Sequence, residues 1–399
     1  MDKTLEKSAD NQLSKEEWRI SGILSGVYAL RMLGLFLVLP VLSLYAAELA
    51  GSQQSMWIGW AMGAYGLTQA CLQLPFGMVS DKWGRKKTIY IGMAMFVIGS
   101  FIAAAATSIE WLVFARALQG AGAISAVITA LMSDLIRDSV RTRAMSMVGM
   151  SIGLTFALSL VAAPLLVSVI GMSGLFVLTG VSMLLAMFAV YKYVPDPEKI
   201  VSTNRLPALQ VALQPQLWRL NYGIFALHAA QMALFVSLPF LLLQMGIAQE
   251  SQWKVYAPMV LFGMVLMVPV IIYGEKKRKL KQTLLFAIGM MVVAQTMLAT
   301  KHDVVMVMTV ALVIYAIAFN VLEAILPSMV AKFAPVEQRG AAMGFYSTAQ
   351  SIGMFFGSVA GGGLFSQFGF EGVFVFATVL MLIWWAIAAT GAAPKPREA

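Results

Sequence analysis

The segment that decides the fold is Gly77-Met78-Val79-Ser80-Asp81-Lys82-Trp83-Gly84-Arg85-Lys86-Lys87, which stands between two long apolar stretches. A bilayer core about 30 Å thick is crossed by about 20 apolar residues in a helix. Charged side chains are expensive inside such a core, so this cluster of acid, glycine and bases is expected to form a short turn at a membrane face. The chain is therefore predicted to cross a membrane on both sides of the segment.

Composition extends this prediction to the whole chain. Of its 399 residues, 60% are hydrophobic and 12% are charged, and the mean hydropathy is +0.80, which leaves too little polar surface to coat a water-soluble globule. The first 19 residues are polar, so no cleavable signal is expected before the first span. We predict twelve spans, at 20–47, 56–80, 88–107, 111–135, 144–170, 174–194, 217–245, 253–274, 282–300, 304–331, 340–366 and 370–391.

The distribution of Lys and Arg predicts the orientation. Bases are frequent in alternate loops, such as 82–87 and 276–281, whereas the loops between them hold only Lys254 and Lys301. Because basic short loops stay on the cytoplasmic side, both termini are predicted to be cytoplasmic. The net charge of +9 is explained by basic loops that face an anionic leaflet, so no nucleic-acid partner is expected.

An internal repeat divides the chain into halves. When the chain is compared with itself at a shift of about 197 residues, Arg31 matches His228 and Pro40 matches Pro239. The predicted organisation is a cytoplasmic N-terminal segment, an N-terminal six-helix bundle, a cytoplasmic linker, a C-terminal six-helix bundle and a cytoplasmic tail. Their limits are 1–19, 20–194, 195–216, 217–391 and 392–399.

Three motifs resemble one family of membrane proteins. The quoted segment, G-x-x-x-D-x-x-G-R-K-K, closely resembles the loop between helices 2 and 3 of the major facilitator superfamily of secondary transporters, and residues 116–122 (Arg-Ala-Leu-Gln-Gly-Ala-Gly) resemble its R-x-x-Q-G-x-G element. Residues 149–164 resemble a glycine-rich element of antiporters, but lack the proline that follows its second glycine. The resemblance implies an all-α membrane protein of twelve transmembrane helices in two pseudo-symmetric six-helix bundles.

Four further segments resemble bacterial drug-efflux members of that superfamily. They are Leu30-Arg31-Met32-Leu33-Gly34, Ala226-Leu227-His228, residues 319–324 with Phe319-Asn320 and Leu322-Glu323-Ala324, and Gly344-Phe345-Tyr346-Ser347-Thr348. The resemblance covers nearly the whole chain. Similar transporters continue past the last span into a small soluble domain, which this chain is expected to lack.

The resemblance also implies that the charged loop acts as a conformational latch. Gly77 is expected to permit a close approach of helices, and Gly84 to permit a tight turn. If span 11 begins near Ala341, Asp81 can cap its N-terminus. This contact would exist only while the cytoplasmic ends of the two halves are together, so it would favour the outward-open state.

A second latch contact is expected between Arg85 and Asp134, at the end of span 4. The alternative is that these charges only solvate a turn and follow the positive-inside rule. That alternative best suits the bases Lys82, Lys86 and Lys87.

Ionisable residues inside spans indicate a substrate or proton cavity, because each costs about 2.5–3.5 kcal/mol to insert and usually faces a partner or water. Arg31 and His228 lie near mid-membrane in spans 1 and 7, and Glu323 is the deep carboxylate that faces them. Glu323 is either a proton site or a static partner of Arg31, and His228 is either a satisfied buried histidine or part of the coupling. Arg116, with Gln119 on the same helical side, either lines the cavity or ties helices together.

Small residues mark helix contacts. Gly353, Gly357 and Gly361 in span 11, and Gly149 and Gly153 in span 5, are expected to let helices pack closely across the two halves.

Catalytic and metal motifs are absent from the sequence, which has two His, one Cys and no phosphate-binding loop, so neither an enzyme nor a cofactor or metal is expected. The leading hypothesis is a monomeric secondary transporter of the bacterial inner membrane that expels amphipathic small molecules in exchange for protons. Two alternatives stay open. One is a proton symporter or facilitator of a polar metabolite, and the other is a receptor or lipid-handling protein of the same fold.

Overall fold

The computed structural model describes residues 13–50, 55–196, 213–335 and 338–393, and their regular structure is entirely helical. Most of the predicted linker, and parts of both predicted terminal segments, lie outside these residues. The helices are α2 (Lys15–Phe36), α3 (Leu39–Ala50), α4 (Ser55–Trp83), α5 (Arg85–Ala104), α6 (Ile109–Ala121), α7 (Ser125–Leu135), α8 (Asp138–Tyr193), α10 (Pro215–Gln244), η1 (Gln249–Ser251), α11 (Trp253–Lys276), α12 (Leu280–Lys301), α13 (Val305–Phe333) and α14 (Arg339–Ala389).

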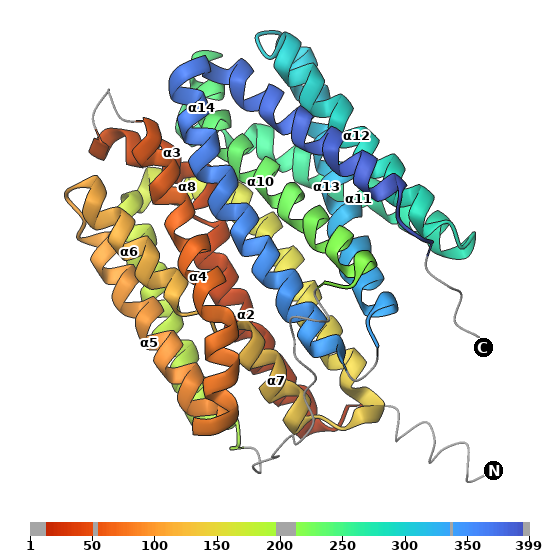
Figure 1. Cartoon of the computed structure of the whole chain (residues 1–399). Helices are drawn as coiled ribbons and strands as arrows, with labels where there is room; N and C mark the ends of the chain where they lie inside the picture. Colours follow the sequence, from red (N-terminus) through yellow and green to blue (C-terminus); the bar gives the residue numbers. More distant parts are fainter. Residues whose placement is uncertain (1–12, 51–54, 197–212, 336–337, 394–399) are drawn as a thin grey trace.

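The helices account for twelve membrane crossings. By length and composition, nine helical segments of the described chain can span a bilayer. Two of these, α8 and α14, contain one glycine of left-handed backbone, Gly171 with φ 68° and Gly369 with φ 61°, and each therefore supplies two crossings. Figure 1 shows α14 in blue, which runs the length of the molecule and turns back. Nine segments of which two cross twice give eleven crossings, and the 29-residue α4 adds one more. The described helices therefore give the predicted twelve crossings.

Two spans that the sequence predicts as continuous are broken. Span 1 consists of α2 and α3, and α3 begins with Leu39 and Pro40. Proline is tolerated in the first turn of a helix because an N–H group there has no intrahelical acceptor. Span 4 consists of α6 and α7, separated by residues 122–124. At this break a side chain on Gly122 would collide with the carbonyl of Gly92 in α5, so the chain passes where only glycine fits.

The two halves of the chain meet along α4 and α14, which run antiparallel. Cβ atoms added at Gly59, Gly63 or Gly66 of α4 would lie 2.5 to 3.1 Å from the backbone oxygens of residues 358, 355 and 351. Such small residues allow two helix backbones to approach closely. The closest packing between the halves therefore comes from glycines that the sequence analysis did not select.

The glycines of span 11 pack within the second half rather than across the halves. A Cβ atom on Gly357 would lie 2.5 Å from the Cα of Ala229, and one on Gly361 would lie 2.8 Å from the Cα of Ala233. Gly353 meets Phe225 in the same way, so three positions of α14 match three positions of α10 at a spacing of four residues. By contrast, Gly149 and Gly153 have open space where a side chain would be. The prediction that these five glycines pack helices closely across the two halves was therefore wrong.

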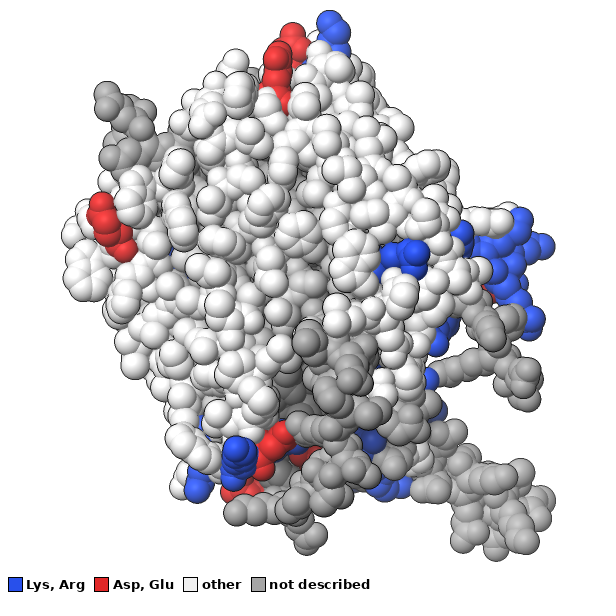
Figure 2. Space-filling model, viewed as in Figure 1, with Lys and Arg blue, Asp and Glu red and all other residues white. Residues whose placement is uncertain are grey.

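On the surface, charged residues lie near the ends of the helices. Figure 2 shows a broad uncharged area across the middle of one face, with blue and red side chains around its edges. A prominent basic group is formed by the exposed bases of the turn between α11 and α12, namely Lys276, Lys277, Arg278 and Lys279. An uncharged belt with charged rims is the surface expected of a protein embedded in a bilayer.

Candidate functional site

A polar cluster in the second half joins three helices. His228 of α10 lies with its Nε2 atom 3.4 Å from the Oε1 atom of Glu323 in α13 and 2.8 Å from the amide nitrogen of Gln350 in α14. The Nδ1 atom of His228 lies 3.2 Å from the carbonyl oxygen of Ile224. We refer to His228, Glu323 and Gln350 as the carboxylate cluster.

The hydrogen bonds indicate where protons lie in this cluster. Because Nδ1 of His228 faces a carbonyl, it carries the ring proton of the neutral form, and Nε2 then accepts a hydrogen bond from the Gln350 amide. The Oε1 atom of Glu323 has no hydrogen-bond partner and faces the same ring nitrogen. Two lone pairs that face each other repel, so the contact favours a proton on Glu323 or a second proton on His228. The cluster therefore brings one carboxyl group and one imidazole ring close enough to compete for a proton.

Gln350 was not selected from the sequence. The available signal was a polar amide in the middle of an apolar span, a residue that is costly in lipid unless it has a partner.

An apolar pocket adjoins the carboxylate cluster. Phe319, one helical turn before Glu323, has its ring centroid 5.9 Å from that of His228 and 5.9 Å from that of Phe156 in α8. Tyr315 stacks on Phe319 at 6.0 Å. The pocket lies between α8, α11 and α13, and its lining residues are Gly153, Phe156, Ala157, Leu160, Met259, Val260, Met264, Tyr315, Ala316, Phe319 and Asn320. Both halves of the chain therefore contribute to an aromatic and Met-lined space beside Glu323.

Arg31 does not contact Glu323. Its Nε atom donates a hydrogen bond to the carbonyl of Gly122 at 3.1 Å, and its Nη1 atom donates to the hydroxyl of Ser125. The guanidinium is fully buried and lies 5.9 Å from the ring centroid of Tyr65. The alternative of a static Arg31–Glu323 pair is therefore not seen in this conformation.

Arg116 and Gln119 form a second buried network in the first half. Arg116 donates to the side-chain oxygen of Gln119 at 2.8 Å, and the Gln119 amide donates to the hydroxyl of Ser100 at 2.9 Å. Arg116 also lies over the ring of Tyr65, at 5.0 Å. Both residues are at most 1% exposed, so this conformation presents them as links between α4, α5 and α6 and keeps them out of any open cavity.

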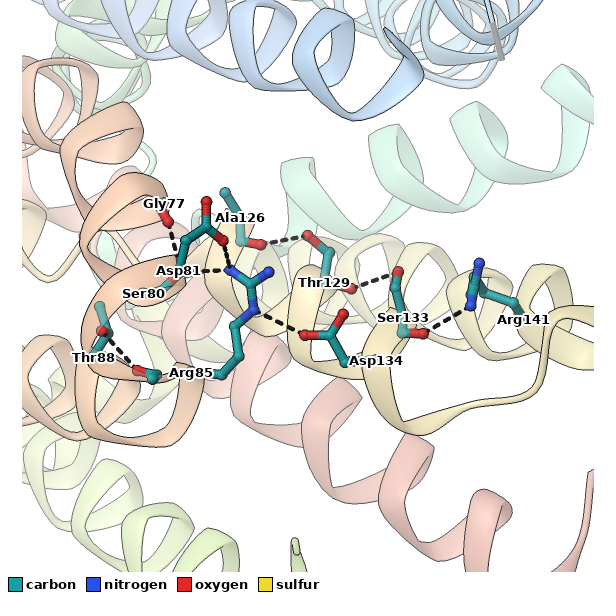
Figure 3. Close-up of polar contacts among 11 residues, drawn as sticks. Gly77, Ser80, Asp81, Arg85, Thr88, Ala126, Thr129, Ser133, Asp134 and Arg141 are labelled. Atoms are coloured by element: carbon teal, nitrogen blue, oxygen red, sulfur yellow. Dashed lines mark hydrogen bonds and ion pairs between the residues drawn. The ribbon is translucent and has the colours of Figure 1, made fainter. Parts of the chain in front are cut away.

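The charged loop between α4 and α5 is organised around Arg85 (Figure 3). Arg85 lies 2.5 Å from Asp81 and 2.9 Å from Asp134 at the end of α7, and it donates to the hydroxyl of Ser80 at 2.7 Å. Ser80 in turn donates to the carbonyl of Gly77 at 2.7 Å. One guanidinium thus holds the end of α4 against the end of α7, with the Arg85–Asp134 contact that the sequence indicated.

The two loop glycines have different roles. Gly84 has φ 105°, a conformation that side chains rarely adopt, at the turn where α4 ends and α5 begins. No atom lies within 4 Å of a Cβ position at Gly77, so close helix approach is not its role in this conformation. Helix α14 begins at Arg339 with Gln338 at its N-cap, and capping of this helix by Asp81 stays a prediction.

The comparisons with known proteins are consistent with this architecture. The model of the Major Facilitator Superfamily matches residues 24–300 and 276–399. The chain belongs to the major facilitator superfamily. It is therefore a secondary transporter and not an enzyme, and no group of His, Cys, Asp or Glu in the described residues could hold a metal ion.

Two relatives and one solved structure define its place in the family. It is 39% identical over 387 residues to the inner membrane transport protein YajR of Escherichia coli, an alignment that covers 96% of this chain and 85% of YajR. It is 33% identical over 337 residues to an uncharacterized transporter of Buchnera aphidicola, covering 83% of this chain and 86% of that protein. The fold matches a bacterial homologue of the human lysosomal transporter Spinster with a TM-score of 0.78 and 15% identity, covering 95% and 97% of the two chains. The similarity to YajR makes this chain a multi-pass protein of the inner membrane.

Proposed function

We propose that this transporter expels amphipathic small molecules in exchange for protons, and that Glu323 is the proton site. The observation that carries the proposal is the contact between Glu323 and His228, in which a carboxylate oxygen without a hydrogen-bond partner faces a ring nitrogen at 3.4 Å. A carboxyl group in this position can release a proton when water reaches it and take one back when water leaves. The Glu323 side chain is 34% exposed, so it is accessible without being free in solvent.

The substrate class is proposed from the pocket beside the carboxylate cluster. Its walls are aromatic, aliphatic and Met side chains, with Asn320 as a polar group. Methionine and aromatic side chains adapt to varied apolar shapes, which suits amphipathic ligands of more than one structure. The pocket has a volume of about 10 Å³ in this conformation, so a substrate would enter only when the pocket widens. Because Phe319 touches both the pocket and the His228 ring, that widening would change the surroundings of Glu323. This arrangement would couple substrate binding to proton release.

The proposal is tested with purified protein in liposomes that enclose a pH-sensitive dye. A fluorescent amphipathic dye is added on one side and a pH gradient is imposed. If the protein exchanges substrate for protons, the amphipathic dye moves against its own gradient while protons move in the opposite direction. Both movements stop when a protonophore collapses the pH gradient. Movement of solute only down its own gradient, unchanged by the protonophore, would establish a facilitator instead.

A further inference from the structure

The break in span 4 creates a helix start in the interior of the first half. Helix α7 has 11 residues and begins at Ser125, directly after the non-helical residues 122–124. The first N–H groups of a helix have no intrahelical acceptor. No hydrogen bond from the backbone N–H of Ser125, Ala126 or Val127 is present in the described part of the chain. The start of α7 is therefore an electropositive end that lies among transmembrane helices.

Arg31 brings a full positive charge to the same place. It donates to the carbonyl of Gly122, the first residue of the break, and to the hydroxyl of Ser125, the first residue of α7. Its Nη2 atom is completely buried and has no hydrogen-bond partner. A buried donor of this kind is costly unless something accepts its hydrogen bond.

The surrounding charges do not balance this site. Arg116, the other buried guanidinium of the first half, lies over the same Tyr65 ring as Arg31. Neither arginine forms an ion pair with a carboxylate of the described residues. A buried charge is normally paired, and here two guanidiniums and the positive end of a helix share one region.

We propose that Arg31 and the start of α7 bind a small monovalent anion, either a carboxylate group or a halide. Such an anion would accept from Nη2 of Arg31 and from the free N–H groups of α7, as anions do at other helix starts. Interrupted transmembrane helices present the same positive end to anionic groups in other transporters. Ser125 is 5% exposed, and Ala126 and Thr129 of the same helix are partly exposed, so the route that we propose for the anion runs along α7. The proposal is independent of proton exchange at Glu323.

The test measures the thermal stability of purified protein at constant sodium concentration and ionic strength, while chloride or benzoate replaces methanesulfonate, a monovalent anion that is neither a halide nor a carboxylate. The wild type is expected to melt at a higher temperature as the chloride or benzoate concentration rises, with a saturable dependence, because a ligand of the folded state stabilises it. Saturation by both anions supports a site that accepts either class, and saturation by one anion alone supports the proposal and identifies its class, halide or organic carboxylate, as the ligand. Equal melting temperatures in all three anions would overturn it.

Three variants make the test specific. Arg31→Gln is expected to lose the saturable shift, whereas Lys277→Gln, which changes an exposed base of the α11–α12 turn, is expected to keep it. Ser125→Asp places a carboxylate of the chain itself beside Arg31, so this variant should melt in methanesulfonate near the temperature of the anion-loaded wild type and respond no further. If Arg31→Gln does not fold, Ser125→Asp decides alone. A full anion-dependent shift in Ser125→Asp, or in a folded Arg31→Gln protein, would refute the site.

Discussion

Arg85 lies between two carboxylates of the first half, 2.5 Å from Asp81 on its own loop and 2.9 Å from Asp134 at the end of α7. Side chains in this arrangement fix the turn between α4 and α5 against the end of α7. Helix α4 is also the helix that packs closely on α14 of the second half. A change at Asp81 is therefore expected to reach the contact between the halves.

We predict that Asp81→Asn shifts the resting population toward the inward-open state and slows turnover while ligand binding persists. The amide keeps the size of the side chain but loses the charge that pairs with Arg85. Accessibility of engineered cysteines on each face measures the shift, in a background where Cys71, the single cysteine, is replaced by serine. Lys82→Gln, which changes the exposed neighbour, is the control. Identical accessibility on both faces in Asp81→Asn and Lys82→Gln would remove the latch.

The orientation gives a second prediction, that both termini lie in the cytoplasm. The exposed bases of the α11–α12 turn and those of residues 82–87 fall on the side predicted to be cytoplasmic. A reporter enzyme that is active only outside the inner membrane should be inactive at either terminus. The same reporter inserted after Lys301, in the opposite set of loops, should be active. Activity at a terminus would reverse the topology.

The predicted spans and the structure agree best where local sequence determines the turn. Gly171 and Gly369 fall in the predicted gaps after 170 and after 366, because a reversal of the chain within one residue requires a left-handed backbone that glycine adopts without strain. The charged loop could be located for a similar reason, since its glycine, acid and bases are adjacent in sequence.

The break in span 4 could not be predicted because non-local contacts stabilise it. Gly120 and Gly122 are as consistent with close helix packing as with an interruption. The contacts that satisfy the break come from Arg31, 91 residues away from Gly122. Likewise, Gln350 becomes a partner of His228 only when α10 and α14 pack together, at a separation of 122 residues. The site residues could be proposed one by one, but their partners depend on packing.

A third prediction concerns the packing of α10 and α14. Gly357→Ala should destabilise the protein by about 1–3 kcal/mol, because the new methyl group would overlap backbone atoms of Ala229 that cannot move aside easily. Gly363→Ala, in the same helix with nothing within 4 Å of its Cβ position, should be neutral or slightly stabilising. The melting temperatures of the two purified variants are compared. Equal stability would show that α14 does not pack on α10 as described.

A fourth prediction concerns an ion pair at the start of α2. Arg137, which precedes α8, donates to both carboxylate oxygens of Glu17 at 2.8 and 2.9 Å. Glu17 also accepts from the backbone N–H of Ser14, where α2 begins. Glu17→Ala should therefore lower stability by about 1.5–3 kcal/mol, the usual contribution of hydrogen bonds to a charged group. Glu16→Ala changes an exposed neighbour and should have little effect on the melting temperature. A loss as large in Glu16→Ala would assign the effect to the charge of the helix start and not to Arg137.

The last prediction concerns energy coupling at Glu323. Replacement by glutamine keeps the shape of the carboxyl group but removes the exchangeable proton. Substrate binding and solute exchange should persist in Glu323→Gln, while accumulation driven by a pH gradient should fail. A gradient of one pH unit supplies about 1.36 kcal/mol per proton, roughly a tenfold accumulation for one-to-one exchange, and the variant should fall to equal concentrations on both sides. The measurement is the steady-state accumulation ratio in liposomes, with exposed Glu371→Gln as the matched control.

The structure separates this coupling role from a structural one. Arg31 has its own partners at Gly122 and Ser125, so loss of the Glu323 charge leaves no guanidinium without its counter-charge. The 3–5 kcal/mol that typically follows the breaking of a buried ion pair should therefore not appear, and the melting temperature of Glu323→Gln should stay near that of the wild type. A well-folded variant that still pumps in a pH-dependent way would exclude Glu323 as the proton site. Coupling would then have to reside at Asp81 and Asp134 beside Arg85, or the protein would be a facilitator.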